Sequence, residues 1–275
     1  MNLLGPLEVV HDGVPTPLGA ARARTVLGFL LLHPNETVSV HRLTEALWPV
    51  DVPSTARKMV RNAVSALRGV LSAADGLCAG SASVVSTARA PGGQGYQLRV
   101  DPEHVDLERF SALRIAGERG LSAGDWGLAS RTLSRALALW RGDVLADFTD
   151  QHLDWPERQA VREEWWAALE GRITADLALG RDHEVIRELS VLLEENPEHA
   201  HLAGMFMLAL YRRGRQVEAL SAYRRTRRAV AARTGHEPCR ELQRVHTAVL
   251  SHAPSLIEPF SGFRHHHQEG GHCDC

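Results

Sequence analysis

The hydrophobic and polar positions along residues 57–71 repeat with the period of an α-helix. At 100° per residue, the apolar side chains share one arc of about 140°, and they are Met59, Val60, Ala63, Val64, Leu67, Val70 and Leu71. The opposite arc, about 140° wide by the same arithmetic, holds Arg57, Lys58, Arg61, Asn62, Ser65 and Arg68. The pattern predicts an amphipathic helix whose polar face has four cations and no acidic residue.

The rest of the first hundred residues alternates between short strand-like and helix-like segments. Two helices are predicted at 20–33 and 41–48, where Pro34 and Pro49 end them. The amphipathic helix begins after Pro53 with Ser54 or Thr55 as its N-cap and runs to about residue 71. Short strands are predicted at 3–10, 14–18 and 37–40, followed by a hairpin of strands 83–87 and 96–100 that a glycine-rich loop joins. Small strands, three helices and then a hairpin are the order of a winged helix.

From His104 to Leu250 the pattern is helical throughout. Three segments align on Gly124, Gly180 and Gly214, each followed by apolar or small residues at the same offsets. The second interval is 34 residues, the tetratricopeptide period, whereas the first is 56. We interpret this as a degenerate repeat of stacked helix pairs; the alternative is chance alignment within a helical bundle. The predicted fold is therefore mainly α with a small β part: an N-terminal winged helix followed by an all-α, tetratricopeptide-like domain.

Composition and charge change along the chain in step with this division. Residues 1–100 have nine Lys and Arg against six Asp and Glu, whereas residues 101–275 have 22 against 27. A basic front and an acidic back suit a DNA-binding module joined to a module with another partner. The predicted domains are 1–100 and 104–252, and the Pro- and Gly-containing remainder, 253–275, is predicted to be disordered.

The cationic helix face is the strongest functional signal in the sequence. An ordinary solvated helix mixes both charge signs, whereas a face without acids suits phosphates. Arginine can pair with a guanine edge and asparagine with an adenine edge. Arg22, Arg24 and Arg89 would add contacts to the DNA backbone. The alternative is a surface helix whose charge is skewed by an arginine-rich genome, since Lys58 is the only lysine among 31 basic residues.

Several other patterns are weighed and set aside. The sequence Gly120–Gly124 matches a nucleophile elbow around Ser122, but that motif needs a preceding strand and here joins two helices. Lys58 follows an arginine rather than a glycine, so no Walker loop is present. The apolar run at 26–32 is too short to span a membrane. We therefore predict no enzyme, no catalytic residue and no membrane association.

Metal and ligand sites have weaker support. The four cysteines match neither a zinc-finger set nor a disulfide framework, which indicates a reduced, cytoplasmic protein. The tail could bind a transition metal, although disorder is favoured; its ligand types are His265, His266, His267, His272, Cys273 and Cys275. Tryptophans of the second half are expected to be core or helix-packing residues, with an aromatic ligand pocket as the alternative; they are Trp126, Trp140, Trp155, Trp165 and Trp166. We predict no metal and no cofactor.

An arginine cluster at 224–228 is favoured as the solvated face of a helix. The alternatives are contact with DNA or with an acidic surface of RNA polymerase.

Several stretches resemble the SARP family, the antibiotic regulatory activators of actinomycetes. In the first half they are LLGPLEV (3–9), HRLTEALWP (41–49), STARKMVRNAVSALRGVL (54–71) and GYQLRV (95–100). In the second half, ALALWRGDVLADF (136–148), ADLALGRDHEVIRELSVLL (175–193) and residues 207–250 resemble the bacterial transcriptional activator domain. The resemblance is collinear over residues 2–250, which makes it more specific than a single motif.

The resemblance implies a response-regulator-type winged helix whose recognition helix is 55–71 and whose wing is 84–98. It implies a transcriptional activator that binds direct repeats in promoter DNA, as a homodimer on DNA, and recruits the RNA polymerase holoenzyme to a biosynthetic gene cluster. This chain has Lys58–Ala63 where relatives often have Asn-Thr-Leu-Gln-Val-His, and Ala66 where arginine is common. The DNA sequence that relatives read is therefore not transferred.

Two other classes of function stay open on the residues alone. One is a helical-repeat adaptor whose winged helix docks protein rather than DNA. The other is a hydrolase that uses Ser122. Salt-dependent binding to DNA separates the first from a regulator, and a strand before Ser122 would be needed for the second.

Overall fold

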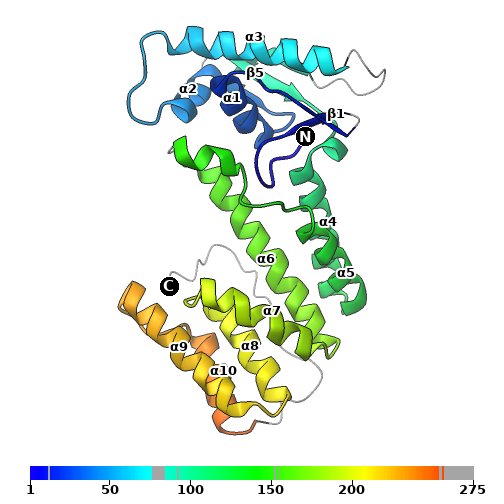
Figure 1. Ribbon diagram of the computed structural model, residues 1–275, viewed down its shortest axis with the longest axis vertical. Helices are drawn as coiled ribbons and strands as arrows, with labels where there is room; N and C mark the ends of the chain where they lie inside the picture. The colour runs from blue at the N-terminus through cyan, green and yellow to red at the C-terminus, as the bar shows by residue number, and fades with distance from the viewer. Residues whose placement is uncertain are drawn as a thin grey trace. The chain divides into compact units, whose positions relative to one another are not determined.

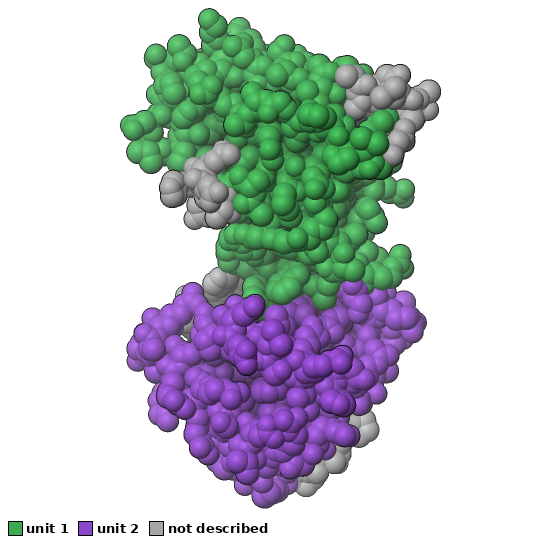
Figure 2. All heavy atoms as spheres, viewed as in Figure 1, with its two compact units in different colours: residues 1–115, 135–166 green, residues 116–134, 167–275 purple. Residues whose placement is uncertain are grey.

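The computed structural model describes residues 1–11, 13–75, 84–91, 93–151, 153, 155–253 and 256. The chain clusters into two compact units, which Figure 2 colours separately. Unit 1 comprises residues 1–115 and 135–166, and unit 2 comprises residues 116–134 and 167–275. The sequence predicted a domain boundary at residues 100–104, where the composition changes. In the structure the boundaries between the two units lie after residues 115, 134 and 166, each inside a helix.

Unit 1 contains the winged-helix elements in the predicted order (Figure 1). Strands β1 (Val9–His11) and β2 (Val14–Thr16) form an antiparallel pair. Next come α1 (Ala21–Leu31), β3 (Thr37–Ser39), α2 (Val40–Leu47), α3 (Ala56–Asp75), β4 (Val84–Ala90) and β5 (Gly93–Arg99). The second sheet has the order β3-β5-β4, with both neighbours antiparallel. Helix α3 packs on α1 and α2.

The helix boundaries lie close to the predicted ones. Ser39 caps α2, where its hydroxyl oxygen accepts a bond from the Arg42 backbone N–H at 3.1 Å. Thr55 stands at the cap position of α3 and accepts, through its carbonyl oxygen, from the N–H groups of Lys58 and Met59. Helix α3 continues to Asp75, beyond the predicted end at residue 71.

The wing differs from the prediction in its turn. The strands were expected at 83–87 and 96–100 with a glycine-rich loop between them, but β4 and β5 are longer and pair as far as Ala90 and Gly93. Gly95 therefore lies within a strand. A Cβ built on Gly95 would lie 2.7 Å from the Val38 carbonyl oxygen. Glycine serves here the close approach of β3 to β5, and the loop interpretation of this glycine is wrong.

The predicted strand at residues 3–10 is also largely wrong. Only Val9 and Val10 of that stretch fall in β1, and Asn2 and Glu8 form an isolated bridge. Leu3 and Leu4 are both fully buried, which strict alternation along a strand would not allow. Their N–H groups donate to the buried Asp106 carboxylate at 2.8–3.0 Å. The turn therefore depends on a residue about a hundred positions away.

Residues 141–157 complete the core of the winged helix from later in the chain. The N–H groups of Arg141 and Leu145 donate to the carbonyl oxygens of Leu4 and Leu3 at 2.7 and 2.9 Å. Phe148, in the 3-10 helix η2 (Ala146–Gln151), packs so closely on α1 that a Cβ on Gly28 would lie 3.0 Å from its ring. The first hundred residues thus do not close their own core.

The later helices, whose order Figure 1 shows, begin with a short 3-10 helix, η1 (Pro102–His104). The helices after it are α4 (Asp106–Ser122), α5 (Trp126–Leu137), α6 (Pro156–Ala178), α7 (Asp182–Glu195), α8 (Ala200–Arg212), α9 (Gln216–Thr234) and α10 (Arg240–Leu250). Within unit 2, α8 packs on α7, α9 and α10. Every residue from Leu202 to Leu210 is buried. No helix of the described part of the chain is long and apolar enough to cross a membrane.

The three aligned glycines mark three helix turns of the same geometry. Gly124, Gly180 and Gly214 have φ of +74°, +73° and +72°. Each donates its N–H to the carbonyl three residues earlier, and the next residue donates to the carbonyl five residues before itself. This is the Schellman arrangement that ends a helix. The residues five positions after each glycine, Ala129, Val185 and Ala219, are fully buried. The repeated pattern is therefore a repeated helix–turn–helix.

Candidate nucleic-acid interface

Helix α3 divides into a buried and an exposed face, as its sequence predicts. Ala63, Val64 and Leu67 are buried among the residues of unit 1, together with Val60 and Leu71. Met59 and Val70 lie at the border and are half-buried. The exposed face carries all six polar residues that the sequence placed there: Arg57, Lys58, Arg61, Asn62, Ser65 and Arg68.

Three cations on this face have no acidic partner in the part of the chain that the structure describes. Among the residues that the structure describes, no carboxylate lies within ion-pair distance of Arg57, Lys58 or Arg61. Neighbouring positive charges destabilise a helix slightly unless a counter-charge meets them. The face therefore presents uncompensated positive charge to solvent, and polyanions are its natural counterpart.

Arg68 has a different role in the structure. Its Nε donates to the Val85 carbonyl oxygen at 2.7 Å, and a terminal nitrogen donates to the Thr87 hydroxyl at 3.0 Å. Both acceptors lie on β4, so the guanidinium joins α3 to the wing. Two of its five N–H donors are committed to this contact. The sequence grouped Arg68 with the residues that would meet DNA, and the structure adds this joining contact.

The remaining predicted site residues lie at separate places in unit 1. Arg89 is exposed beside the turn of the hairpin, paired in register with Gln94. Arg22 is exposed in the first turn of α1. Arg24 is half-buried and forms an ion pair with Asp147. That carboxylate also accepts from the Leu7 N–H at 3.0 Å. Arg24 on α1 is therefore paired with a residue of segment 141–157, which completes the core of unit 1.

The second half of the chain matches a known domain family. The bacterial transcriptional activator domain covers residues 105–250. The regulatory protein DnrI of Streptomyces peucetius is 33% identical over 256 residues, which are 93% of each protein. The chain belongs to the SARP family.

Other relatives of this SARP-family chain are longer. The transcriptional regulatory protein EmbR of Mycobacterium tuberculosis is 37% identical over 253 residues, 92% of this chain and 63% of EmbR. AfsR of Streptomyces coelicolor is 36% identical over 260 residues, which are 94% of this chain and 25% of AfsR. These relatives are regulators rather than enzymes, as the sequence predicted.

A solved structure supports the fold of the SARP-family chain. Mycobacterium tuberculosis EmbR, in complex with a low-affinity phosphopeptide, superposes with a TM-score of 0.80 at 36% identity. The match covers 92% of this chain and 65% of that one. The N-terminal strands and the helical second half are therefore those of the family.

The hydrolase interpretation is contradicted within this SARP-family chain. Ser122 is the last residue of α4, and its hydroxyl donates to the Glu118 carbonyl oxygen at 3.0 Å. A helix, rather than a strand, precedes it, so the geometry of a nucleophile elbow is absent. Among the five tryptophans only Trp155 is buried, and the others are half-buried. Trp155 packs on Phe29, and Trp140 packs on Phe110 and Trp165.

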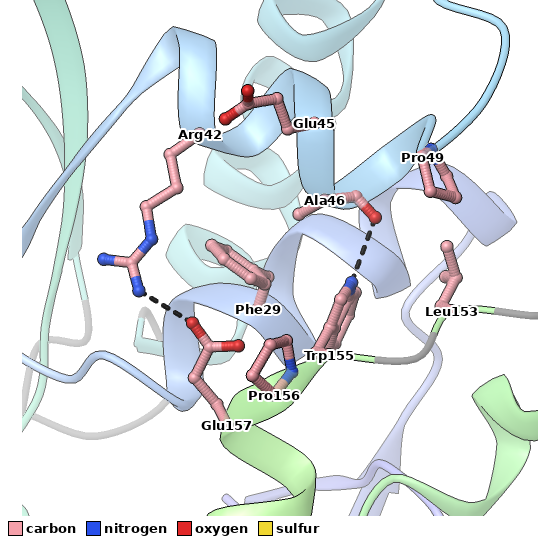
Figure 3. A pocket seen from close by; sticks show the side chains of 9 residues that line it. All are labelled: Phe29, Arg42, Glu45, Ala46, Pro49, Leu153, Trp155, Pro156 and Glu157. Atoms are coloured by element: carbon pink, nitrogen blue, oxygen red, sulfur yellow. Dashed lines mark hydrogen bonds and ion pairs between the residues drawn. The ribbon is translucent and has the colours of Figure 1, made fainter.

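Sequence reasoning missed a pocket in unit 1 of the SARP-family chain, drawn in Figure 3. It has a volume of about 230 Å³, and Phe29, Arg42, Glu45, Ala46, Pro49, Leu153, Trp155, Pro156 and Glu157 line it. Arg42 donates to Glu157 at 2.7 Å, and the Trp155 indole donates to the Ala46 carbonyl oxygen at 3.0 Å. No local pattern could indicate this, because the partners are more than a hundred residues apart in sequence.

His33 joins the same pair of segments. Its Nε2 lies 3.1 Å from a Glu157 oxygen. Burial and the charge of Arg42 lower the pKa of His33 against the opposing effect of Glu157. Burial alone would raise the pKa of Glu157, but bonds from its own N–H, Arg42 and His33 together lower it. The charged carboxylate therefore fixes the start of α6 to α1 and α2.

The candidate metal site of the tail lies outside the described part of the chain. The histidines and cysteines of the tail lie outside the described residues, as does most of the predicted disordered segment. Within the described part of the chain, no group of three metal-ligating side chains comes together.

Proposed function

We propose that this chain is a sequence-specific, DNA-binding transcriptional activator. The observation that carries the proposal is the exposed face of α3, where Arg57, Lys58 and Arg61 have no carboxylate partner among the described residues. This face lies on a helix held rigidly by its buried side, next to a β-hairpin. A helix of this kind fits the major groove, where base edges carry sequence information.

The side chains divide into two roles. Arg61 and Asn62, midway along the exposed face, read base edges in the major groove. Arg57, Lys58 and Ser65 contact phosphates and fix the position of the helix. Arg89 on the wing and Arg22 on α1 reach the adjacent backbone. Arg68 holds the wing against α3 and so sets the spacing between the two contacts.

The family suggests the wider setting. Two copies bind direct repeats in promoter DNA as a homodimer, where the first copy raises the effective concentration of the second. The bound pair recruits the RNA polymerase holoenzyme. The regulated genes form a secondary-metabolite cluster, and the protein acts in the cytoplasm. The SARP membership supports each of these points.

A binding titration on upstream and neighbouring promoter DNA at two salt concentrations tests the proposal. Wild type is expected to bind tightly at low salt and to lose affinity steeply as salt rises. Arg57→Ala/Lys58→Ala/Arg61→Ala should abolish selective binding, whereas Arg131→Ala on α5, an exposed arginine outside the interface, should not change it. A folded protein that binds none of the fragments would overturn the proposal in favour of an adaptor.

A further inference from the structure

Unit 2 is electrically polarised along the sequence of its later helices. Residues 167–211 have three arginines against eight Asp and Glu, whereas residues 212–250 have ten arginines against three Glu. The first stretch includes α7 and most of α8, and the second includes α9 and α10. Helix α8 packs on α7 and also on α9 and α10. Opposite charges therefore gather on different helices around one shared core helix.

An acidic stripe runs along the outer side of α7. Its residues are Glu184, Glu188, Val191 and Glu195, which fall within an arc of about 60° at 100° per residue. Glu184 and Glu195 are exposed and have no basic partner among the described residues, while Glu188 pairs with Arg172 at 2.5 Å. Val191 is 58% exposed in the middle of the stripe.

A basic stripe with the same residue spacing runs along α9. Its residues are Val217, Ser221, Arg224 and Arg228, again within about 60°. Arg224 and Arg228 are exposed, and no carboxylate of the described chain pairs with either. Val217 is 79% exposed. No acidic residue occurs between Glu218 and Glu237.

The surroundings of the basic stripe strengthen its positive field. Arg225 is exposed beside it. His246 of α10 stacks on Tyr223 with ring centroids 3.8 Å apart. Burial and the positive charges of Arg224 and Arg227 lower the pKa of this histidine. Arg227 is neutralised by its ion pair with Glu237, whereas Arg224, Arg225 and Arg228 have no carboxylate partner among the described residues.

We propose that the basic stripe of one copy docks on the acidic stripe of a second copy, head to tail. Both stripes follow the 4-3-4 spacing that lets two helices pack along a common seam. Packed antiparallel, Glu184 meets Arg228 and Glu188, which also pairs with Arg172, meets Arg224. In the same register Val191 lies opposite Ser221, and Glu195 lies opposite Val217. Because one chain carries both stripes, the contact joins different surfaces of the two copies.

The contact is small, so its affinity is modest when the copies are free in solution. DNA that holds two copies side by side would raise their effective concentration and favour it. In that respect the inference rests on the proposed function. The stripes themselves are properties of unit 2, and their association can be measured without DNA.

Sedimentation of the full chain over a wide range of concentration, at low and high salt, tests the docking. Wild type should associate at low salt and dissociate as salt screens the charges. Glu184→Arg alone and Arg228→Glu alone should each weaken association at least about tenfold, because like charges then face each other. The chain that carries both reversals should associate again, because the pair is swapped. Arg131→Glu, outside both stripes, is the matched control and should behave as wild type.

Two results would overturn the proposal. One is wild-type protein that stays monomeric at low salt or associates unchanged in the single variants, or a double reversal that does not restore association. The other is Arg228→Glu lowering the affinity for DNA with a single binding site together with its salt dependence, which would make the stripe a phosphate contact. Since the sedimentation test contains no DNA, a failure to bind DNA would leave its result intact.

Discussion

The Arg68 guanidinium donates to the Val85 carbonyl oxygen at 2.7 Å and thereby joins the middle of α3 to the first strand of the wing. A second bond to the Thr87 hydroxyl fixes the direction of the side chain. The carbonyl belongs to the backbone, so the contact is independent of the residue at position 85. Helix α3 and the wing are in this way joined by two side-chain bonds within unit 1.

Arg68→Ala should therefore lower DNA affinity without changing its salt dependence. Loss of a side-chain bond to the wing costs about 1–2 kcal/mol of stability and lets the hairpin move. Arg57→Ala, by contrast, should reduce the slope of log affinity against log salt by about one. Titrations of both variants at several salt concentrations separate the roles. An equal reduction of the slope in Arg68→Ala would show that this arginine contacts phosphate.

Two glycines should respond to alanine with opposite sign. Gly180 has φ of +73° at the end of α6, and open space surrounds it, so Gly180→Ala costs only the left-handed conformation, about 1–2 kcal/mol of unfolding free energy. Gly69 lies inside α3 with no atom near a built Cβ, and Gly69→Ala should stabilise by about 0.5–1 kcal/mol. Thermal unfolding of both variants measures this. If both substitutions lowered the stability, the opposite backbone requirements of Gly180 and Gly69 would not explain their effects.

The pH dependence of stability should depend on Glu170. Burial in unit 2 raises its pKa to about 7. The folded state therefore holds this proton while the unfolded state loses it near its ordinary, lower pKa. The contribution of Glu170 to stability is therefore greatest at low pH, falls as pH rises from the unfolded pKa to about 7, and stays reduced above.

Glu170→Gln removes the ionising group and should stabilise the protein above pH 7 by up to about 2–3 kcal/mol, with little effect near pH 4. His199 and His201 lie 3.8 and 3.9 Å from the carboxylate, and as cations they would oppose this shift. Burial lowers the pKa of His199, however, which reduces this opposition. Denaturant unfolding at pH 5 and pH 8 measures the difference; a pH-independent effect would contradict the buried, protonated carboxyl.

Asp106→Ala should destabilise unit 1 by about 2–4 kcal/mol. The substitution leaves the buried N–H groups of Leu3 and Leu4 without an acceptor, which costs the full desolvation of those groups. Asp101→Ala is a suitable control, because Asp101 caps an exposed turn by a single bond at 3.0 Å and its loss should cost less. Equal effects of the two changes in chemical denaturation would mean that the N-terminal turn does not depend on α4.

The periodicity of the sequence predicted most of the helix boundaries and helix turns. The amphipathic pattern of α3, the prolines after α1 and α2 and the three aligned glycines each arise from interactions within a few residues, so helix boundaries and turns followed from the sequence. The prediction of a strand at 3–8 was wrong because the N–H groups of Leu3 and Leu4 donate to the Asp106 carboxylate, in a turn that buries both side chains. The prediction of a glycine-rich loop in the hairpin was wrong because Gly95 allows β3 to approach β5 closely and does not form a turn.

The site was predictable in composition but not in the use of each side chain. The face of α3 follows from a 100° rotation per residue, which is why all six polar positions are exposed. The bonds of Arg68 to β4 and of Arg24 to Asp147 depend on segments 17 and 123 residues away. Charge patterns indicate that an arginine is exposed, but only tertiary structure decides whether its donors are already occupied.

The most direct measurement of the central claim compares affinity for a promoter site with affinity for unrelated DNA. The ratio should fall at least about tenfold in Arg61→Ala/Asn62→Ala, because each lost base contact costs about 1–3 kcal/mol of discrimination. Binding to unrelated DNA should change far less, because phosphate contacts from Arg57 and Lys58 remain. A ratio that is unchanged in a folded variant would contradict the claim that the exposed face of α3 reads DNA.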